Sequence, residues 1–185
     1  MLSSKKWLVL TLLLLAVACV QVAPRAIGSP SVKEEIMLSQ ILNANLQRLK
    51  VLYRYTHDMK VEAGRFQSPR HQARYRFAPS EHHGKALMSL ARKMHMDFDL
   101  VRGILGFANV PNRDTLIKQI QDGSQALATY GRRALRARKD GNFALYLASA
   151  QAAEKELKSI DIALRDIEEA INASIRESDS RMEDL

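Results

Sequence analysis

The chain has 185 residues, of which 46% are hydrophobic, and it carries one cysteine and a formal net charge of +8. It is long enough for one domain with a hydrophobic core. A single cysteine excludes a disulfide within the chain, so the core must hold the fold together without a covalent crosslink.

The first 20 residues have the features of an export signal. Two lysines supply the positive charge, and residues 7–20 form a run of 14 residues without a charge. Such a run is shorter than the about 20 apolar residues of a membrane span and matches the apolar region of a signal peptide. Small residues at Ala16 and Ala18 predict cleavage directly before Cys19. Residues 1–18 are therefore predicted to be a signal peptide.

The cleavage site has a second feature, because small apolar residues end in Ala18 and are followed at once by Cys19. This pattern resembles the lipobox of bacterial lipoproteins, over residues 5–19 only. The resemblance implies that a lipid is attached to the Cys19 thiol and holds the mature protein on a membrane. It also implies the bacterial outer membrane, facing the periplasm, because Val20 rather than Asp follows the cysteine. The alternative is an ordinary signal peptide that is discarded with Cys19, which gives a secreted protein.

The segment after the cysteine differs in composition from the rest of the chain. Residues 19–31 contain two prolines and show no helical period, which predicts a flexible tether. We expect a helical bundle domain over residues 32–176. The apolar pattern is lost after Ile175, which predicts a frayed acidic tail over residues 177–185.

Charge is unevenly distributed along the chain. Residues 19–139 hold 21 basic and 9 acidic side chains, whereas residues 140–185 hold 5 basic and 11 acidic ones. Opposite charges on two parts of one chain attract each other. We therefore expect the acidic last helix to lie against the basic remainder.

Apolar residues recur at spacings of three and four in four segments, and no strand-like alternation appears. The first of these seams comprises Leu38, Leu42, Asn45, Leu49, Leu52, Thr56 and Met59. The last comprises Phe143, Tyr146, Ala150, Ala153, Leu157, Ile160, Leu164, Ile167 and Ile171. Turn residues at 109–112 and 140–142 predict short connections, and Ser80 is suited to cap a helix. The sequence predicts an all-α fold, a four-helix and largely antiparallel bundle with a long C-terminal helix. The longer connection over 65–79 leaves the direction of the first helix open.

That connection belongs to a segment with an unusual composition, GRFQSPRHQARYRFAP over residues 64–79. Arginine forks with aromatic neighbours suit an anionic surface such as lipid head groups. They also suit single-stranded nucleic acid, but an exported protein seldom meets it, so no nucleic-acid partner is expected. The alternative is a solvated connector whose aromatic rings cover the end of the bundle. The residues predicted to contact an anionic partner are Arg65, Arg70, Arg74, Tyr75 and Arg76.

Methionine and histidine gather over residues 82–99, in HHGKALMSLARKMHMDFD. Such side chains are soft or borderline ligands that suit copper outside the cytoplasm. Met88, His95 and Asp99 share one helix face and are the predicted metal ligands. A fourth ligand must come from elsewhere. The alternative is that the methionines only fill gaps in the core.

The sequence contains no motif for attached haem, a di-iron bundle, a phosphate loop or a nucleophile elbow. We expect neither an enzyme nor a resident cofactor. The expected function is that of an exported, lipid-anchored bundle acting as a non-catalytic binding or envelope-assembly factor at a membrane surface. A helical protein partner would dock through residues 143–175. The alternatives are a secreted lipid carrier of the apolipoprotein type and a periplasmic copper-binding bundle.

Overall fold

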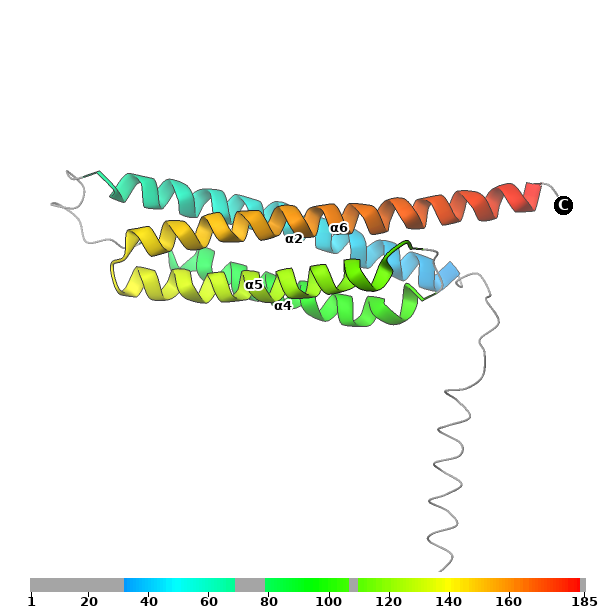
Figure 1. Ribbon diagram of the computed structural model, residues 1–185, viewed down its shortest axis with the longest axis horizontal. Coiled ribbons are helices and arrows are strands. Elements are labelled where there is room, and N and C mark those ends of the chain that lie inside the picture. The colour runs from blue at the N-terminus through cyan, green and yellow to red at the C-terminus, as the bar shows by residue number, and fades with distance from the viewer. Residues whose placement is uncertain (1–31, 69–78, 107–109, 184–185) are drawn as a thin grey trace, which may run out of the picture.

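The computed structural model describes residues 32–68, 79–106 and 110–183 (Figure 1). Helix α2 spans Val32–Phe66, α4 spans Glu81–Ile104, α5 spans Arg113–Lys139 and α6 spans Phe143–Glu183. These ranges contain no β-strand, so the predicted all-α class is confirmed. None of the helices in this part of the chain combines the length and the apolar character that crossing a membrane requires.

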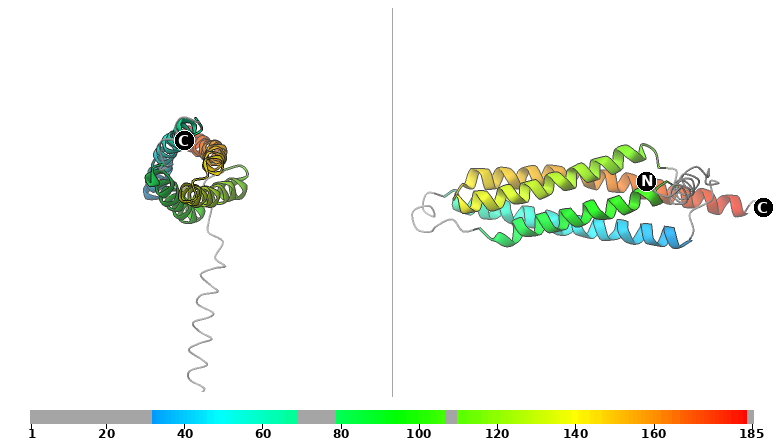
Figure 2. Two further views of the ribbon diagram at one scale, coloured as in Figure 1. Left: turned by 90° about the vertical axis from the view of Figure 1, so that its left-hand side faces the viewer. Right: turned by 90° about the horizontal axis from the view of Figure 1, so that it is seen from below.

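The four helices form one antiparallel bundle. Helix α2 packs against α4 and α6, and α5 packs against the same two helices, so each helix has two neighbours around a shared core. The end-on view in Figure 2 shows this ring of four. Helix α2 runs antiparallel to both of its neighbours (Figure 1), which settles the direction that the long 65–79 connection left open.

The predicted seams form the core of the bundle. Every residue of the first seam, from Leu38 to Met59, is at most 5% exposed. In α6, all seam residues from Tyr146 to Ile167 are at most 1% exposed, and the seam residues at the two ends are half-buried. Burying one such Leu, Ile or Phe side chain contributes about 1.5–3 kcal/mol. The apolar seams therefore supply most of the stability of a chain without disulfides.

One polar contact crosses the interface between α2 and α4. The fully buried Asn45 side chain donates from Nδ2 to the Ile41 carbonyl at 2.9 Å and to Asp97 Oδ2 at 3.2 Å. Arg48 forms an ion pair with the same Asp97 carboxylate. A buried amide without partners would cost about 1–3 kcal/mol, so these bonds favour one register of α2 against α4.

Two of the predicted helix boundaries are formed by local capping. Ser80 caps α4 as predicted, because its Oγ accepts a hydrogen bond from His82 N at 3.2 Å. At the turn between α5 and α6, Gly141 adopts a positive φ of 66°, and Asn142 N donates to the Ala137 carbonyl at 2.8 Å. A glycine in this conformation is the usual end of an α-helix. The Asn142 side chain then caps α6 by accepting from Leu145 N at 2.9 Å.

Helix α6 ends later than the sequence predicted. Residues 177–183 were expected to fray, but α6 continues to Glu183 and extends past the other helices at the end where α2 begins (Figure 1). The sequence RESDSRME contains neither glycine nor proline, so no residue in it interrupts the helical backbone. The loss of the apolar pattern after Ile175 therefore does not mark the end of the helix.

Candidate functional site

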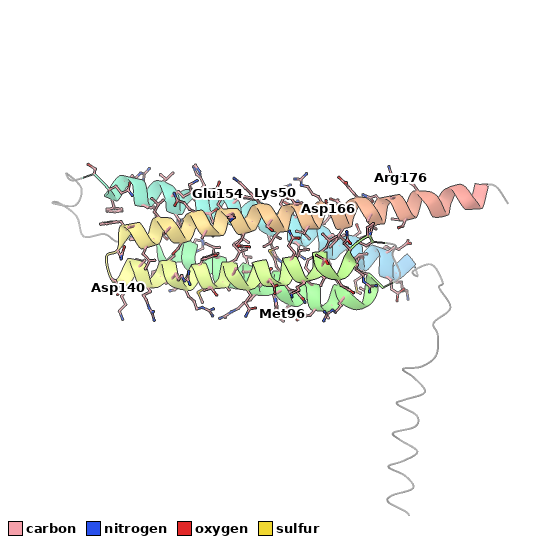
Figure 3. The ribbon with its side chains drawn as sticks, in the orientation of Figure 1. Lys50, Met96, Asp140, Glu154, Asp166 and Arg176 are labelled. Carbon is pink, nitrogen blue, oxygen red and sulfur yellow. The ribbon has the colours of Figure 1, made fainter. Side chains whose placement is uncertain are left out.

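The ends of the bundle differ in the connections that they carry. At one end α2 stops, α4 starts, and α5 turns into α6 at Gly141; we call this the loop end (Figure 1). The opposite end, where α2 begins at Val32, is the N-terminal end. Figure 3 labels Asp140 at the loop end and Arg176 towards the N-terminal end. The described parts of the basic segment, residues 64–68 and Pro79, lie at the loop end.

The Glu62 carboxylate of α2 joins three elements at the loop end. Its Oε2 accepts from Ser80 N, which precedes α4, and from the Tyr146 hydroxyl of α6, both at 3.2 Å. Its Oε1 lies 3.6 Å from Nε2 of His83 on α4. One carboxylate thus holds the start of α4 and the start of α6 against the last turns of α2.

Burial and the neighbouring carboxylate act together on Tyr146. The residue is 1% exposed. Burial first, then the negative charge of Glu62 and the hydrogen bond to it, raise the pKa of the Tyr146 phenol well above its usual value of 10.0. The phenol therefore stays protonated at neutral pH and acts as a fixed hydrogen-bond donor.

Two histidines and a tyrosine pack beside this carboxylate. His82 Nε2 lies 3.0 Å from the Tyr55 hydroxyl, and the Tyr55 ring contacts the rings of His82 and His83 at 5.2 and 5.4 Å. His83 Nδ1 is buried with no hydrogen-bond partner among the described residues. The rings fill the space between α2 and α4 and support the start of α4.

Arg138 ties the end of α5 to the start of α4. Its Nε donates to the Pro79 carbonyl, and its Nη1 lies 2.7 Å from Glu81 Oε1. Lys85 contacts the other oxygen of Glu81 at 2.6 Å. The Lys85 hydrogen bond and charge, followed by the Arg138 charge, lower the pKa of the exposed Glu81 carboxyl below its usual value. Arg138 is thus committed to a structural contact.

Four other basic side chains near the end of α5 are exposed to solvent. They are Arg132, Arg133, Arg136 and Lys139. Arg132 donates to Thr129 Oγ1 at 3.0 Å, and the Arg133 guanidinium lies 5.8 Å from the centre of the Tyr130 ring. Among the described residues, the ion pairs within 4.0 Å all involve other cations. We call these four residues the basic stripe.

The basic stripe is a second source of positive charge at the loop end. Residues 129–153, which run through the turn from α5 into α6, contain five basic side chains and one acidic side chain. A helix C-terminus favours cations in its last turn through the helix dipole. The stripe starts at Arg132, about two turns before the helix ends at Lys139, so the dipole explains only part of it. The stripe leaves positive charge exposed to solvent.

The surface beside the stripe is open rather than enclosed. A depression of about 530 Å³ at the loop end is lined by Gln67, Asp140, Gly141, Asn142, Phe143 and Ala144. The Phe143 ring stacks on Phe66, with ring centres 5.8 Å apart. A second depression, of about 360 Å³, follows α5 and includes Asp122, Tyr130 and Arg133. These shapes suit contact with an extended surface better than capture of a small molecule.

The structure describes some of the residues that the sequence singled out. Arg65 is exposed in the last turn of α2, at the loop end. Cys19, Arg70, Arg74, Tyr75 and Arg76 lie outside the described residues.

The three predicted metal ligands have protein contacts of their own. The Cγ of half-buried Met88 would lie 2.7 Å from a Cβ on Gly131, so it packs against α5. Nδ1 of His95 lies 3.4 Å from the Gln121 carbonyl, and Asp99 Oδ1 accepts from Gln121 Nε2 at 2.6 Å. The described residues contain no group of three or more His, Cys, Asp or Glu side chains placed to hold a metal ion.

Among the residues that the structure describes, the expected charge complementarity of the last helix appears in one ion pair between helices. Lys60 on α2 lies 2.7 Å from Glu154 on α6. The other ion pairs of α6 among the described residues, Glu154 with Lys158 and Asp161 with Arg165, lie within the helix itself. Much of the positive charge of α5 is therefore not neutralised by α6.

Sequence reasoning missed both the Glu62 cluster and the basic stripe. The stripe had a visible signal, since residues 132–139 hold five cations in eight positions and no acidic residue. The Glu62 cluster had none, because its members lie at residues 62, 80, 83 and 146 and meet only once the direction of α2 is known.

Comparisons with known proteins give no match: no family model fits the chain, and neither a curated protein nor a solved structure is significantly similar to it.

Proposed function

We propose that the protein is exported, anchored to a membrane by a lipid on Cys19, and acts as a non-catalytic binding or envelope-assembly factor. In this proposal residues 19–31 are the tether and the bundle is the working part. The anchor rests on the lipobox resemblance of residues 5–19. The bundle presents its loop end to an anionic component of the cell envelope, such as lipid head groups.

The observation that carries the binding function is the set of exposed cations at the loop end. The basic stripe and Arg65 have no carboxylate within 4.0 Å among the described residues. The sequence adds Arg70, Arg74 and Arg76 in the connection that joins α2 to α4 at the same end. Each basic residue near an anionic membrane contributes about 1 kcal/mol, so several together give useful affinity.

The described geometry also supports binding rather than catalysis. The buried polar groups of the loop end are committed to holding helices together, as Glu62 and Arg138 show. The depressions beside them are open to solvent rather than enclosed. Arginine forks suit phosphate groups, which they bind through two parallel hydrogen bonds.

The experiment is vesicle binding by the mature chain, residues 19–185, which contains every described residue. We expect the chain to co-sediment with phosphatidylglycerol vesicles at low salt and much less with neutral phosphatidylcholine vesicles. Added salt should weaken binding, because the Debye length falls from about 10 Å at 0.1 M to about 3 Å at 1 M.

The test variant is R65Q/R70Q/R74Q/R76Q, and the matched control is R92Q/K93Q/R102Q/K118Q. The control removes four exposed charges from the second half of α4 and the first turns of α5, with Arg92 and Lys93 at the midpoint of α4. We expect binding to fall only in the test variant. Equal binding by the wild type and the test variant would remove the basic segment from the proposal. A rise in helix content on neutral vesicles would instead favour the apolipoprotein-type carrier.

A further inference from the structure

The start of α2 and the basic stripe lie at opposite ends of a long bundle. Residues 19–31 precede α2 in the sequence, and α2 begins at Val32 at the N-terminal end. The stripe lies on the last turns of α5, at the loop end (Figure 1). Helix α2 alone has 35 residues, which is about 50 Å at 1.5 Å per residue.

The N-terminal end carries charge of the opposite sign. Residues 161–183 of α6 hold seven acidic and three basic side chains, and α2 begins with Glu34 and Glu35. Figure 3 places Asp166 and Arg176 on this half of the molecule and Asp140 on the other. The bundle is therefore electrically polarised along its axis, with its negative end where α2 begins.

The tether is too short for the bundle to invert on its own membrane. Thirteen residues span at most about 45 Å when fully extended, and about 20 Å on average for a flexible chain. If the loop end faced the membrane that holds the anchor, the tether would have to extend along the full length of α2, about 50 Å. The loop end could reach its own membrane only if the bundle lay flat. That position would bring the Asp122 carboxylate, which lines the same depression as Arg133, towards anionic head groups.

We propose that the basic stripe, Arg132, Arg133, Arg136 and Lys139, binds a second phospholipid bilayer in trans, so that the bundle bridges two anionic surfaces. This inference rests on the proposed anchor at Cys19. The partner is a bilayer rich in anionic phospholipid, because the stripe is an exposed helix face with Tyr130 beside Arg133. A flexible polyanion would need a groove to follow, and the nearest depression contains the Asp122 carboxylate.

A tethering assay tests the inference. The mature chain is coupled through Cys19, its sole cysteine, to a maleimide lipid in neutral phosphatidylcholine vesicles. Acceptor vesicles of phosphatidylglycerol or of phosphatidylcholine are then added, and energy transfer between dyes in the two populations reports tethering. We expect tethering of phosphatidylglycerol acceptors only.

The stripe variant R132Q/R133Q/R136Q/K139Q is expected to lower the tethering rate by about a hundredfold or more, since four interfacial charges are lost. The smaller variant R136Q/K139Q should lower it by about tenfold, which keeps the test valid if the larger variant folds poorly by circular dichroism. The control R92Q/K93Q/R102Q/K118Q removes four exposed charges elsewhere and should stay within about twofold of wild type.

The outcomes separate this inference from the proposed function. If the free chain binds phosphatidylglycerol but the coupled chain does not tether, the trans geometry is wrong and the binding function stands. If the free chain binds no vesicle, both are overturned. If the tethering rate fell equally in the stripe and control variants, the loss would follow from net charge alone. That result would contradict binding through the basic stripe. If the chain bound soluble polyphosphate but tethered no vesicles, the partner of the stripe would be an anionic polymer rather than a bilayer. That result would also contradict the inference.

Discussion

The Tyr146 hydroxyl on α6 donates to Glu62 Oε2 on α2 at 3.2 Å, at the end of the bundle that carries the exposed cations. Because Glu62 also accepts from Ser80 N, the same carboxylate fixes the start of α4. The α4 start is in turn bonded to Arg138 near the end of α5. This chain of contacts holds the ends of all four helices together and so sets where the basic stripe lies.

Replacing Tyr146 by phenylalanine removes the hydrogen bond and keeps the ring. We expect Y146F to lower the free energy of unfolding by about 1–2 kcal/mol, because a buried hydrogen bond to a charged group is lost. Urea unfolding followed by circular dichroism measures the change. The matched control is Y53F on the same bundle, where Tyr53 is half-buried and its hydroxyl has no hydrogen bond among the described residues. Equal losses in the two variants would show that the Glu62 contact adds nothing.

The raised pKa of Tyr146 also predicts a loss of stability at alkaline pH. Burial and Glu62 raise the pKa of the folded state above the usual 10.0, so above pH 10 the folded protein binds more protons than the unfolded chain. The contribution is complete below pH 10 and is lost as the pH rises through the folded value. Burial also raises the pKa of Tyr53, although that residue is more exposed.

Unfolding free energies measured between pH 8 and pH 11 check this prediction. We expect a decline that starts near pH 10 and is smaller in Y146F than in wild type. A decline of the same size in both proteins would assign the effect to other groups.

Replacing glycine by alanine is expected to have opposite effects on the stability of the bundle at Gly131 and at Gly103. A Cβ at Gly131 on α5 would lie 2.7 Å from Met88 Cγ and 2.8 Å from the Gly84 carbonyl oxygen, and the latter belongs to the α4 backbone. We expect G131A to destabilise the bundle by about 1–2 kcal/mol, since overpacking exceeds the gain in helix propensity. A Cβ at Gly103 on α4 meets nothing within 4 Å, so G103A should stabilise by about 0.4–1 kcal/mol. Melting temperatures that shift in the same direction would contradict the close packing of α4 on α5.

The fold followed from the sequence because its periodicity is regular. The seam from Leu38 to Met59 has spacings that only a helix places on one face, and all of it is buried. Even Asn45 and Thr56 belong to the buried face, because each hydrogen-bonds a backbone carbonyl of its own helix. The turn at 140–142 was likewise predicted from the sequence Asp140-Gly141-Asn142, which is typical of a turn.

The site was harder to predict because it depends on which helix ends meet. The sequence drew attention to residues 64–79, but the cations of the basic stripe reach the same end from α5 only because successive helices alternate in direction. The Met88, His95 and Asp99 face was predicted from spacing alone. Spacing could not reveal that Gln121 of the neighbouring α5 contacts both His95 and Asp99.

The proposed function depends on a lipid attached to Cys19 at the start of the mature chain. The most direct measurement is the mass of the N-terminal peptide of protein purified from the membranes of the cells that produce it. We predict a peptide that starts at Cys19 and carries acyl chains. An unmodified peptide that starts beyond Cys19 would contradict the anchor and would favour the secreted carrier.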